Sequence, residues 1–211
     1  MRSIPPATVS RLPVYLRSLR DLPSSQPTCS SDQLAALAGV NSAQVRKDLS
    51  FLSPAGVRGV GYDVGTLAEL LRHALGLTRT YPVVVIGAGN LGSALANYRG
   101  FGTWGFEVVA ILDSDPDKVG SELAGVTVEP ISDLERVVAD GGIAIAIIAT
   151  PADAAQDVAD RLVGANVRSI LNFAPTSLRV PANVAVRRVH LSTELQILTY
   201  HLRHLEDEAG G

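Results

Sequence analysis

Residues 83–92 read VVVIGAGNLG and are followed by Ser-Ala-Leu-Ala. Four apolar residues in a row at 83–86 predict a strand that is buried on both faces of a parallel sheet. The spacing G-x-G-x-x-G follows directly: Gly87 permits a sharp turn, Gly89 lets a pyrophosphate approach the backbone, and Gly92 lets a helix pack closely on the strand. The stretch therefore predicts the first strand, turn and helix of a dinucleotide-binding fold, with the first amides of the helix facing the phosphates.

A second strand is predicted at residues 106–112 (FEVVAIL), and it ends at Asp113, 21 residues past Gly92. A carboxylate at about this distance holds the ribose hydroxyls of the adenosine in such folds. Ser114 and Asp115 follow with no adjacent arginine, so a 2′-phosphate would meet negative charge, and we expect NAD(H) rather than NADP(H). The alternative for Asp113 is a cap at the start of a loop or helix.

The remaining pattern alternates between strands (125–128, 143–149, 167–171, then 184–189) and helices (133–138, 152–163). This alternation predicts a Rossmann-type, doubly wound parallel sheet, whose ligands bind beyond the carboxyl ends of the strands. Residues of the glycine turn and residues that follow the strands are therefore expected to meet at one nucleotide site: Gly87, Ala88, Gly89, Asn90, Leu91, Gly92, Asp113, Thr150, Pro151, Asn172, Phe173, Ala174 and Pro175.

Charge separates the front of the chain from the rest. Residues 1–79 hold nine Lys/Arg and five Asp/Glu, whereas residues 80–211 hold nine and sixteen, for a net charge of −3. This asymmetry indicates that only the front meets a polyanion. The chain has one cysteine, Cys29, and we find no signal peptide and no apolar run long enough to span a bilayer. We therefore expect a cytoplasmic protein without membrane association.

Two short helices joined by a glycine are predicted within residues 30–53 (SSDQLAALAGVNSAQVRKDLSFLS). Ser30 or Ser31 would cap the first and Asn41 or Ser42 the second, with Gly39 in the turn. A helix at 10–22, capped by Ser10, precedes them. On the second helix the buried stripe is Val45, Leu49 and Leu52, and the opposite face carries Ala43, Arg46, Lys47 and Ser50, with Gln44 at its edge. Such a pair is typical of a helix-turn-helix that places its second helix in the major groove, where Gln44 could pair with adenine. The alternative is an ordinary amphipathic helix with solvated charges.

The next stretch, GVRGVGYDV at 56–64, predicts a β-hairpin wing with Arg58 at its tip, followed by a leucine-rich helix that Asp63 caps and Gly76 ends. Residues 1–79 thus predict a winged-helix DNA-binding domain, with residues 77–82 as the linker. The candidate DNA contacts are Ser42, Gln44, Arg46, Lys47, Ser50, Arg58, Gly59 and Tyr62.

A final helix at 192–206 carries leucines at 191, 195, 198, 202 and 205, close to a 3.5-residue repeat. That repeat is typical of a helix that packs along another helix. Because the sheet is already complete, we expect a second copy of the chain as the partner, although packing on its own domain is the alternative. The predicted domains are 1–79, an NAD(H)-binding domain at 80–190, and a dimerisation helix at 191–211.

Six segments taken together resemble the Rex family of bacterial redox-sensing repressors: VSRLPVYLRSL, SAQVRKDLSFLSPAGVRGVGY, IGAGNLGSALANYRGF, LDSDPDKVG, ILNFAP and LSTELQIL. The resemblance covers nearly the whole chain in order. It implies an α/β protein with a winged helix, a Rossmann domain and a swapped C-terminal helix. It also implies a homodimeric repressor that binds an inverted-repeat operator and is released by NADH, with NAD⁺ binding more weakly or competing.

The resemblance also assigns roles to single residues. Tyr98 matches a tyrosine near the nicotinamide, and Leu191 matches a position that the swapped helix inserts beside the partner's nicotinamide. Arg17 matches an arginine that pairs with an acid just before that helix, but here that position is His190. Because histidine changes charge near neutral pH, we hypothesise that His190 makes NADH-driven release pH-sensitive; the alternative is a histidine with no role.

Two other functions remain open on the residues alone. An NAD-dependent dehydrogenase needs a proton donor beside the nicotinamide, and none of the four histidines and two lysines is placed to form a catalytic pair. We therefore expect that the protein is not an enzyme and has neither catalytic residues nor a metal site. A repressor that binds another nucleotide, such as a coenzyme A derivative, is compatible with the strand and glycine pattern, although Asp113 suits a free ribose diol.

Overall fold

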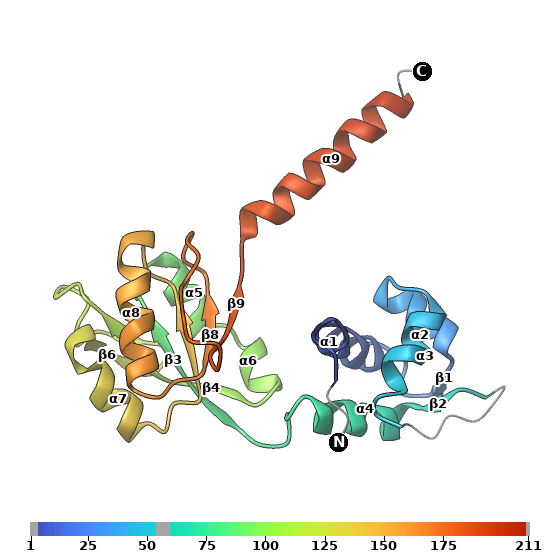
Figure 1. Ribbon diagram of the computed structural model, residues 1–211, viewed down its shortest axis with the longest axis horizontal. Coiled ribbons are helices and arrows are strands. Elements are labelled where there is room, and N and C mark those ends of the chain that lie inside the picture. Colours follow the sequence, from blue (N-terminus) through green and yellow to red (C-terminus); the bar gives the residue numbers. More distant parts are fainter. Residues whose placement is uncertain (1–3, 54–59, 210–211) are drawn as a thin grey trace. The chain divides into compact units, whose positions relative to one another are not determined.

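The computed structural model describes residues 4–53 and 60–209, with side chains as far as Arg203 (Figure 1). The chain divides into two compact units, Met1–Arg79 and Thr80–Gly211. Among the described helices, none is long and apolar enough to cross a membrane.

The front unit is a small helical domain with a two-stranded sheet. Its apolar core includes Leu16 of the first helix, Leu34 of the second, Leu49 of the third and Leu71 of the last, each at most 2% exposed. The elements are α1 (Pro6–Arg20), β1 (Thr28–Cys29), α2 (Ser31–Ala38), α3 (Ser42–Leu49), β2 (Tyr62–Asp63) and α4 (Val64–Ala74).

The first helix is longer than the sequence predicted. It begins at Pro6, because the carbonyl of Pro5 already accepts hydrogen bonds from the amides of Thr8 and Val9. The expected start at Ser10 is therefore wrong, and Pro13 lies inside the helix rather than in its first turn. An interior proline removes one backbone hydrogen bond at a cost of about 3 kcal/mol. Burial of the helix's leucine face offsets this cost.

The helix-turn-helix prediction is confirmed. Ser30 caps α2 in a capping box with Gln33, and Asn41 caps α3 by accepting from the amide of Gln44 at 2.8 Å. Between them Gly39 has a φ of +67°, the left-handed conformation that ends α2 and turns the chain. Asp63 caps α4 as expected, through the amide of Thr66.

The predicted wing is only partly described. Its return strand β2 pairs antiparallel with β1, a strand that the sequence analysis did not predict. The chain approaches closely there, because a Cβ on Gly61 would lie 2.5 Å from the carbonyl oxygen of Cys29. Arg58 and Gly59 lie outside the described residues, so the structure does not place them.

The second unit is an α/β fold around a seven-stranded sheet of order β5-β6-β4-β3-β7-β8-β9. All strand pairs are parallel except the edge pair β5–β6. From β6 to β9 the order is that of a dinucleotide-binding fold, and the predicted Rossmann-type sheet is confirmed. The strands are β3 (Tyr81–Ile86), β4 (Phe106–Asp113), β5 (Glu122–Leu123), β6 (Val126–Pro130), β7 (Ile145–Ile148), β8 (Ser169–Asn172) and β9 (Ala185–Arg188).

Helices cover both faces of this sheet (Figure 1). On one face α7 and α8 pack against inward side chains such as Val84 and Ile86. On the other face α5 and α6 pack against Val83 and Val85. Alternate residues of β3 thus enter two different cores, which explains its uninterrupted apolar sequence. The helical elements are α5 (Asn90–Ala96), α6 (Gly100–Thr103), the 3₁₀ turn η1 (Ile131–Asp133), α7 (Leu134–Asp140), α8 (Ala152–Gly164) and α9 (Leu191–Ala209).

Some predicted boundaries in this unit are wrong. Strand β3 begins at Tyr81 rather than Val83, because the amide of Tyr81 donates to Gly105 and the carbonyl of Pro82 accepts from Ala144. Two residues of the predicted linker are thus part of the sheet. Neither β5 nor α6 was predicted, since each is shorter than the shortest periodic pattern that a sequence reveals.

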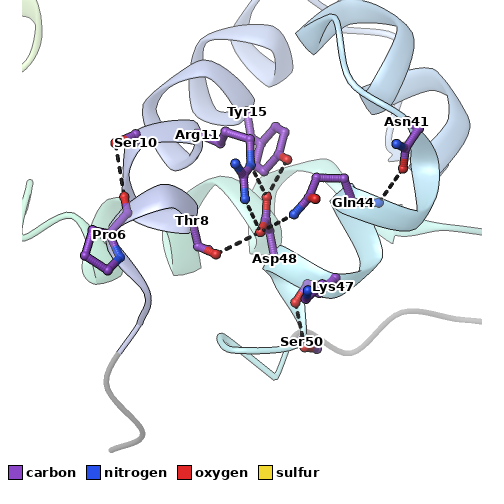
Figure 2. A network of polar contacts seen from close by, with 10 residues as sticks. All are labelled: Pro6, Thr8, Ser10, Arg11, Tyr15, Asn41, Gln44, Lys47, Asp48 and Ser50. Atoms are coloured by element: carbon purple, nitrogen blue, oxygen red, sulfur yellow. Dashed lines mark hydrogen bonds and ion pairs between the residues drawn. The ribbon is translucent and has the colours of Figure 1, made fainter.

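A buried carboxylate, that of Asp48 on α3, connects α3 to α1 (Figure 2). From α1 it receives hydrogen bonds from Thr8 Oγ1 (2.9 Å), Arg11 Nε and Nη2 (2.5 and 2.8 Å) and Tyr15 Oη (2.8 Å). From its own helix it accepts a hydrogen bond from Gln44 Nε2 at 2.8 Å. Burial raises the pKa of Asp48, but these hydrogen bonds outweigh burial and hold the pKa well below its ordinary range. Asp48 is therefore ionised and fully satisfied at neutral pH.

This network predicts an acid-sensitive contribution to stability. Because the native pKa of Asp48 is depressed, its stabilisation is present above the unfolded-state pKa of about 3.9 and is lost as the pH falls towards the native value. Asp48→Asn should lower the free energy of unfolding by about 3 kcal/mol at pH 7, the low end for a buried pair because Arg11 is partly exposed. At pH 3, about one unit below the unfolded-state pKa, the loss should be about 1 kcal/mol smaller. Urea unfolding of the full chain, followed by circular dichroism at both pH values, measures this.

Asp32→Asn is the matched control, because Asp32 is an exposed acid in the first turn of α2. It should cost less than about 1 kcal/mol. Equal stabilities of Asp48→Asn and the wild type at pH 7 would contradict the assigned role of Asp48.

Candidate functional site

The glycine turn after β3 has the geometry that its sequence predicts. Gly87 has a φ of +102°, and its amide donates to the carbonyl of Leu112 at 2.7 Å. A Cβ on Gly92 would fall against the carbonyl oxygen of Gly87, so only glycine allows α5 to approach β3 this closely. A Cβ on Gly89 would meet nothing within 4 Å. Gly87 and Gly92 are therefore needed by the fold itself, whereas Gly89 leaves open space beside the backbone.

The N-terminus of α5 faces this open space. Gly89 occupies the cap position, and no side chain caps the helix. The first amides of a helix have no partner within the helix itself. Those of Asn90 and Leu91 are therefore suited to an anionic group, as at other helix starts.

Asp113 stands at the carboxyl end of β4 and is 7% exposed. Its carboxylate accepts hydrogen bonds from the amide of Ala88 at 2.6 Å and from that of Asp115 at 2.8 Å. Burial raises the pKa of Asp113, but these bonds and the nearby Lys118 outweigh burial and lower it, so the carboxylate is charged. Asp113 thus fixes both the glycine turn and its own loop, and the loop-capping alternative describes part of its role.

Lys118 corrects one argument drawn from the sequence. Its Nζ lies 3.4 Å from Asp113 and 3.3 Å from Asp115, because the turn after β4 folds back on itself. The acids there are partly neutralised, so the negative charge that a 2′-phosphate would meet is weaker than expected, although two acids still face one lysine. The spacing of three between Asp115 and Lys118 was the signal that could have found this contact.

A cavity of about 610 Å³ lies over the carboxyl ends of β3, β4 and β7, within the range of small-molecule and cofactor sites. It brings together seven of the expected nucleotide contacts: Gly87, Gly89, Asn90, Leu91, Asp113, Thr150 and Pro151. Ala88 and Gly92 belong to the same turn without lining the cavity. Sequence reasoning missed the other lining residues, which are Ile86, Leu112, Ser114, Asp115, Lys118, Ile131, Ala149, Ala154, Asp157, Val158 and Arg161.

One wall of the cavity is fixed by an ion pair between helices. Arg161 of α8 donates from Nε and Nη2 to the two carboxylate oxygens of Glu135 on α7, at 2.8 and 2.7 Å. The guanidinium lowers the pKa of Glu135 to about 2. Two-point contacts of this kind fix the plane of the arginine, which therefore presents a rigid surface to the cavity.

Thr150 supplies an unused polar group. Its Oγ1 is buried at the cavity and has no hydrogen-bond partner within the described structure. An unsatisfied buried hydroxyl costs about 1–3 kcal/mol. Together with the open backbone at Gly89 and the carboxylate of Asp113, this hydroxyl fits a polar ligand with hydroxyl and phosphate groups.

The segment after β8 does not line this cavity. Asn172 is 1% exposed, and its side chain accepts from the amide of Ala174 at 3.0 Å and donates to the carbonyl of Thr176 at 2.9 Å. Ala174 is buried in the core, Phe173 packs on the opposite face of the sheet, and Pro175 is exposed. Within one chain these residues shape a loop, and their contact with a nucleotide stays a prediction.

The proposed switch residues and Leu191 do not line the cavity. Tyr98 is 58% exposed and packs edge to face on Phe101, with ring centroids 5.0 Å apart. Leu191 is 62% exposed at the start of α9, and His190 is exposed just before it, with its carbonyl accepting from Thr193. Arg17 is exposed on α1 in the other unit, so its pairing with His190 stays a prediction.

The exposed face of α3 carries the expected DNA contacts. Arg46, Lys47 and Ser50 are exposed, and Arg46 Nη1 donates to Ser31 Oγ at 3.0 Å. Ser50 follows the helix as its C-cap and donates to the carbonyl of Lys47. Ser42 and Tyr62 are half-buried. This face is small and basic, which suits a groove of nucleic acid.

Sequence reasoning missed Asp48, which lies on the buried side of the same helix. The expected stripe was Val45, Leu49 and Leu52, and Asp48 is buried between the first two at 0% exposure. A charge inside an apolar stripe was the available signal, since buried acids need partners. Those partners, Arg11 and Tyr15, are more than thirty residues away in sequence.

Comparison with known proteins agrees with both regions. Residues 78–176 match the family described as CoA binding domain, and residues 3–50 match that described as putative DNA-binding protein N-terminus. The chain is 57% identical over 201 residues to the redox-sensing transcriptional repressor Rex of Streptomyces coelicolor, covering 95% of this chain and 78% of that protein. It is 51% identical to the protein of the same name from Carboxydothermus hydrogenoformans, covering 95% and 97%.

Solved structures extend this similarity to the whole fold. A Rex-family repressor, RSP, in complex with β-NAD⁺ and operator DNA is 38% identical with a TM-score of 0.90, covering 100% of this chain and 97% of that chain. RSP in complex with β-NADH is 37% identical with a TM-score of 0.88, covering 100% and 99%.

These relatives are named as repressors rather than enzymes, in agreement with the expectation that this chain has no catalytic function. At such identity over nearly the full length, this chain belongs to the Rex family of redox-sensing transcriptional repressors.

Proposed function

We propose that this protein represses transcription by binding operator DNA as a homodimer and that NADH releases it, so that it senses the NADH/NAD⁺ ratio in the cytoplasm. The observation that carries the proposal is the presence, in one chain, of a basic recognition helix and a nucleotide-sized cavity at the glycine turn. RSP, similar to this chain over its whole length, has been solved with NADH and with NAD⁺ plus operator DNA.

At the cavity, the chain's own groups suit NAD(H). The amides of Asn90 and Leu91 would hold the pyrophosphate, with the space beside Gly89 admitting it. Asp113 would accept the adenosine ribose hydroxyls, and Thr150 Oγ1 would gain the hydrogen bond that it lacks. The dinucleotide itself supplies a nicotinamide ring whose charge depends on its redox state. Tyr98, Leu191 and the loop 172–175 would approach that ring in the dimer.

At the other surface, Arg46, Lys47 and Arg58 would contact DNA. Two recognition helices must lie about 34–36 Å apart to enter successive major grooves of an inverted repeat. A ligand that prefers one arrangement of the dimer changes this spacing, and a useful switch needs a coupling of about 1–3 kcal/mol.

The dimer is proposed from α9. Its described apolar side chains are about half exposed or more, among them Leu195 (64%), Leu198 (56%) and Leu202 (58%). A helix in water does not keep such a stripe uncovered, and a second copy of α9 with its own stripe is a matching partner.

A coenzyme A derivative is the second candidate ligand, favoured by the family description that residues 78–176 match. Asp113 opposes it, because a charged carboxylate at the ribose position suits free hydroxyls rather than the 3′-phosphate of coenzyme A. Lys118 reduces this opposition without removing it, since two acids face one lysine.

The function is tested by a gel shift on an inverted-repeat operator. NADH should release the protein, with the apparent affinity for DNA falling about 5- to 150-fold, the range of a coupling of 1–3 kcal/mol. NAD⁺ and coenzyme A at equal concentration should release much less. Unchanged DNA binding at saturating NADH would contradict the proposal, and release by coenzyme A alone would favour the second candidate.

Two glycine variants test the nucleotide site. Gly89→Ala should leave the melting temperature nearly unchanged, because its Cβ meets nothing, while NADH binding weakens at least tenfold since the methyl occupies the space for the phosphates. Gly92→Ala should instead lower the melting temperature, because its Cβ collides with the carbonyl of Gly87. Calorimetric titration with NADH and thermal melts measure both. Wild-type NADH affinity in Gly89→Ala would rule out this placement of the phosphates.

A variant of α9 tests the dimer. Leu195→Glu/Leu198→Glu should convert the dimer to a monomer and abolish cooperative operator binding, because charges replace the centre of the stripe. Gln196→Glu, on an exposed residue outside the stripe, is the control and should remain dimeric. Light scattering coupled to size exclusion gives the masses, and a stable dimer of the double variant would refute the role of α9.

A further inference from the structure

One contact within the recognition helix is not explained by stability alone. Gln44 and Asp48 lie one turn apart on α3, and Gln44 Nε2 donates to Asp48 Oδ1 at 2.8 Å (Figure 2). Asp48 is fully buried, whereas Gln44 is half-buried at the edge of the face that exposes Arg46 and Lys47. The pair therefore joins the buried network to the surface that meets DNA.

The chemistry of Asp48 decides which way the amide of Gln44 faces. An ionised carboxylate only accepts hydrogen bonds, so the group turned towards it must be the NH₂ of Gln44 and not its carbonyl. Arg11 binds the same carboxylate through Nε and Nη2, which prevents Asp48 from rotating away. The reversed amide would place its oxygen against the carboxylate and is excluded by repulsion.

If the proton trans to the carbonyl makes this bond, the second N–H of Gln44 and its carbonyl oxygen lie on the same edge of the amide and are left for another partner. A donor and an acceptor side by side match the N7 acceptor and N6 donor of adenine in the major groove. We propose that Asp48 is a positioning residue for base readout, holding Gln44 so that this edge reads an adenine in each half-site. The proposal rests on the proposed function as an operator-binding repressor.

The test uses the full chain and a library of randomised DNA duplexes, selected by binding and then sequenced. The wild type should select an inverted repeat with an adenine at one position of each half-site. In Gln44→Ala, the preference for adenine over other bases at that position should fall about 5- to 150-fold, the value of one two-point base contact. The base preferences at the other positions should be unchanged. Asp48→Asn should lose the preference at the same position, because its own amide can donate to the carbonyl of Gln44 and reverse it.

A double variant and a control separate positioning from stability. In a Gln44→Ala background, Asp48→Asn should cause no further loss of base preference. Leu16→Ala removes a buried side chain of α1 that takes no part in the hydrogen bonds of Asp48, so it should lower stability and keep the full adenine preference. The proposal is overturned if Asp48→Asn retains that preference, or if it weakens all positions equally. Failure of the wild type to select any repeat would instead contradict the proposed function.

A second measurement keeps the proposal testable if Asp48→Asn does not fold. In ¹⁵N spectra of the wild-type operator complex, the side-chain amide of Gln44 is assigned by its loss in Gln44→Ala. Both of its protons should exchange slowly with solvent, one held by Asp48 and one by the base. The exposed Gln196 provides the fast reference. Exchange of both Gln44 protons at the rate of Gln196 would overturn the assignment.

Discussion

Both candidate surfaces of this protein depend on a carboxylate that is buried, charged and hydrogen-bonded at both of its oxygens. Asp48 and Asp113 are the only charged side chains classed as buried among those that the structure describes. Removing such a charge from water costs several kcal/mol, and only donors in fixed positions offset that cost. Each acid therefore imposes geometry on its surroundings: Asp48 fixes α3 against α1, and Asp113 fixes the glycine turn against the end of β4.

The two acids differ in where their donors come from. Asp48 is bound by side chains, and the positive charge of the Arg11 guanidinium offsets the negative charge of its carboxylate. Asp113 is bound by backbone amides, with Lys118 at longer range, so lone pairs of its oxygens remain for a ligand. A carboxylate whose donors are side chains is thus suited to fix one helix against another. A carboxylate whose donors are the backbone amides of a loop can fix that loop and also accept hydrogen bonds from a ligand.

The sequence predicted most of the architecture because its signals are local. The apolar run of β3, the caps at Ser30 and Asn41, and the close approach of Gly92 to Gly87 each involve neighbours within a few residues. What it missed depends on tertiary contact. Asp48 finds Arg11 only after folding, Lys118 meets Asp113 through a turn, and β1 pairs with a strand more than thirty residues later. Asn172 is hydrogen-bonded within its own loop, which the sequence did not indicate, and its contact with a nucleotide stays a prediction.

The uncovered leucines of α9 have a consequence for the protein's abundance in the cell. If two copies must meet before this stripe is covered, the active species forms in proportion to the square of the chain concentration when copies are scarce. Operator occupancy would then respond to the number of repressor molecules more steeply than one-to-one. A cell could therefore change the redox level at which its genes respond by changing how much of this protein it makes.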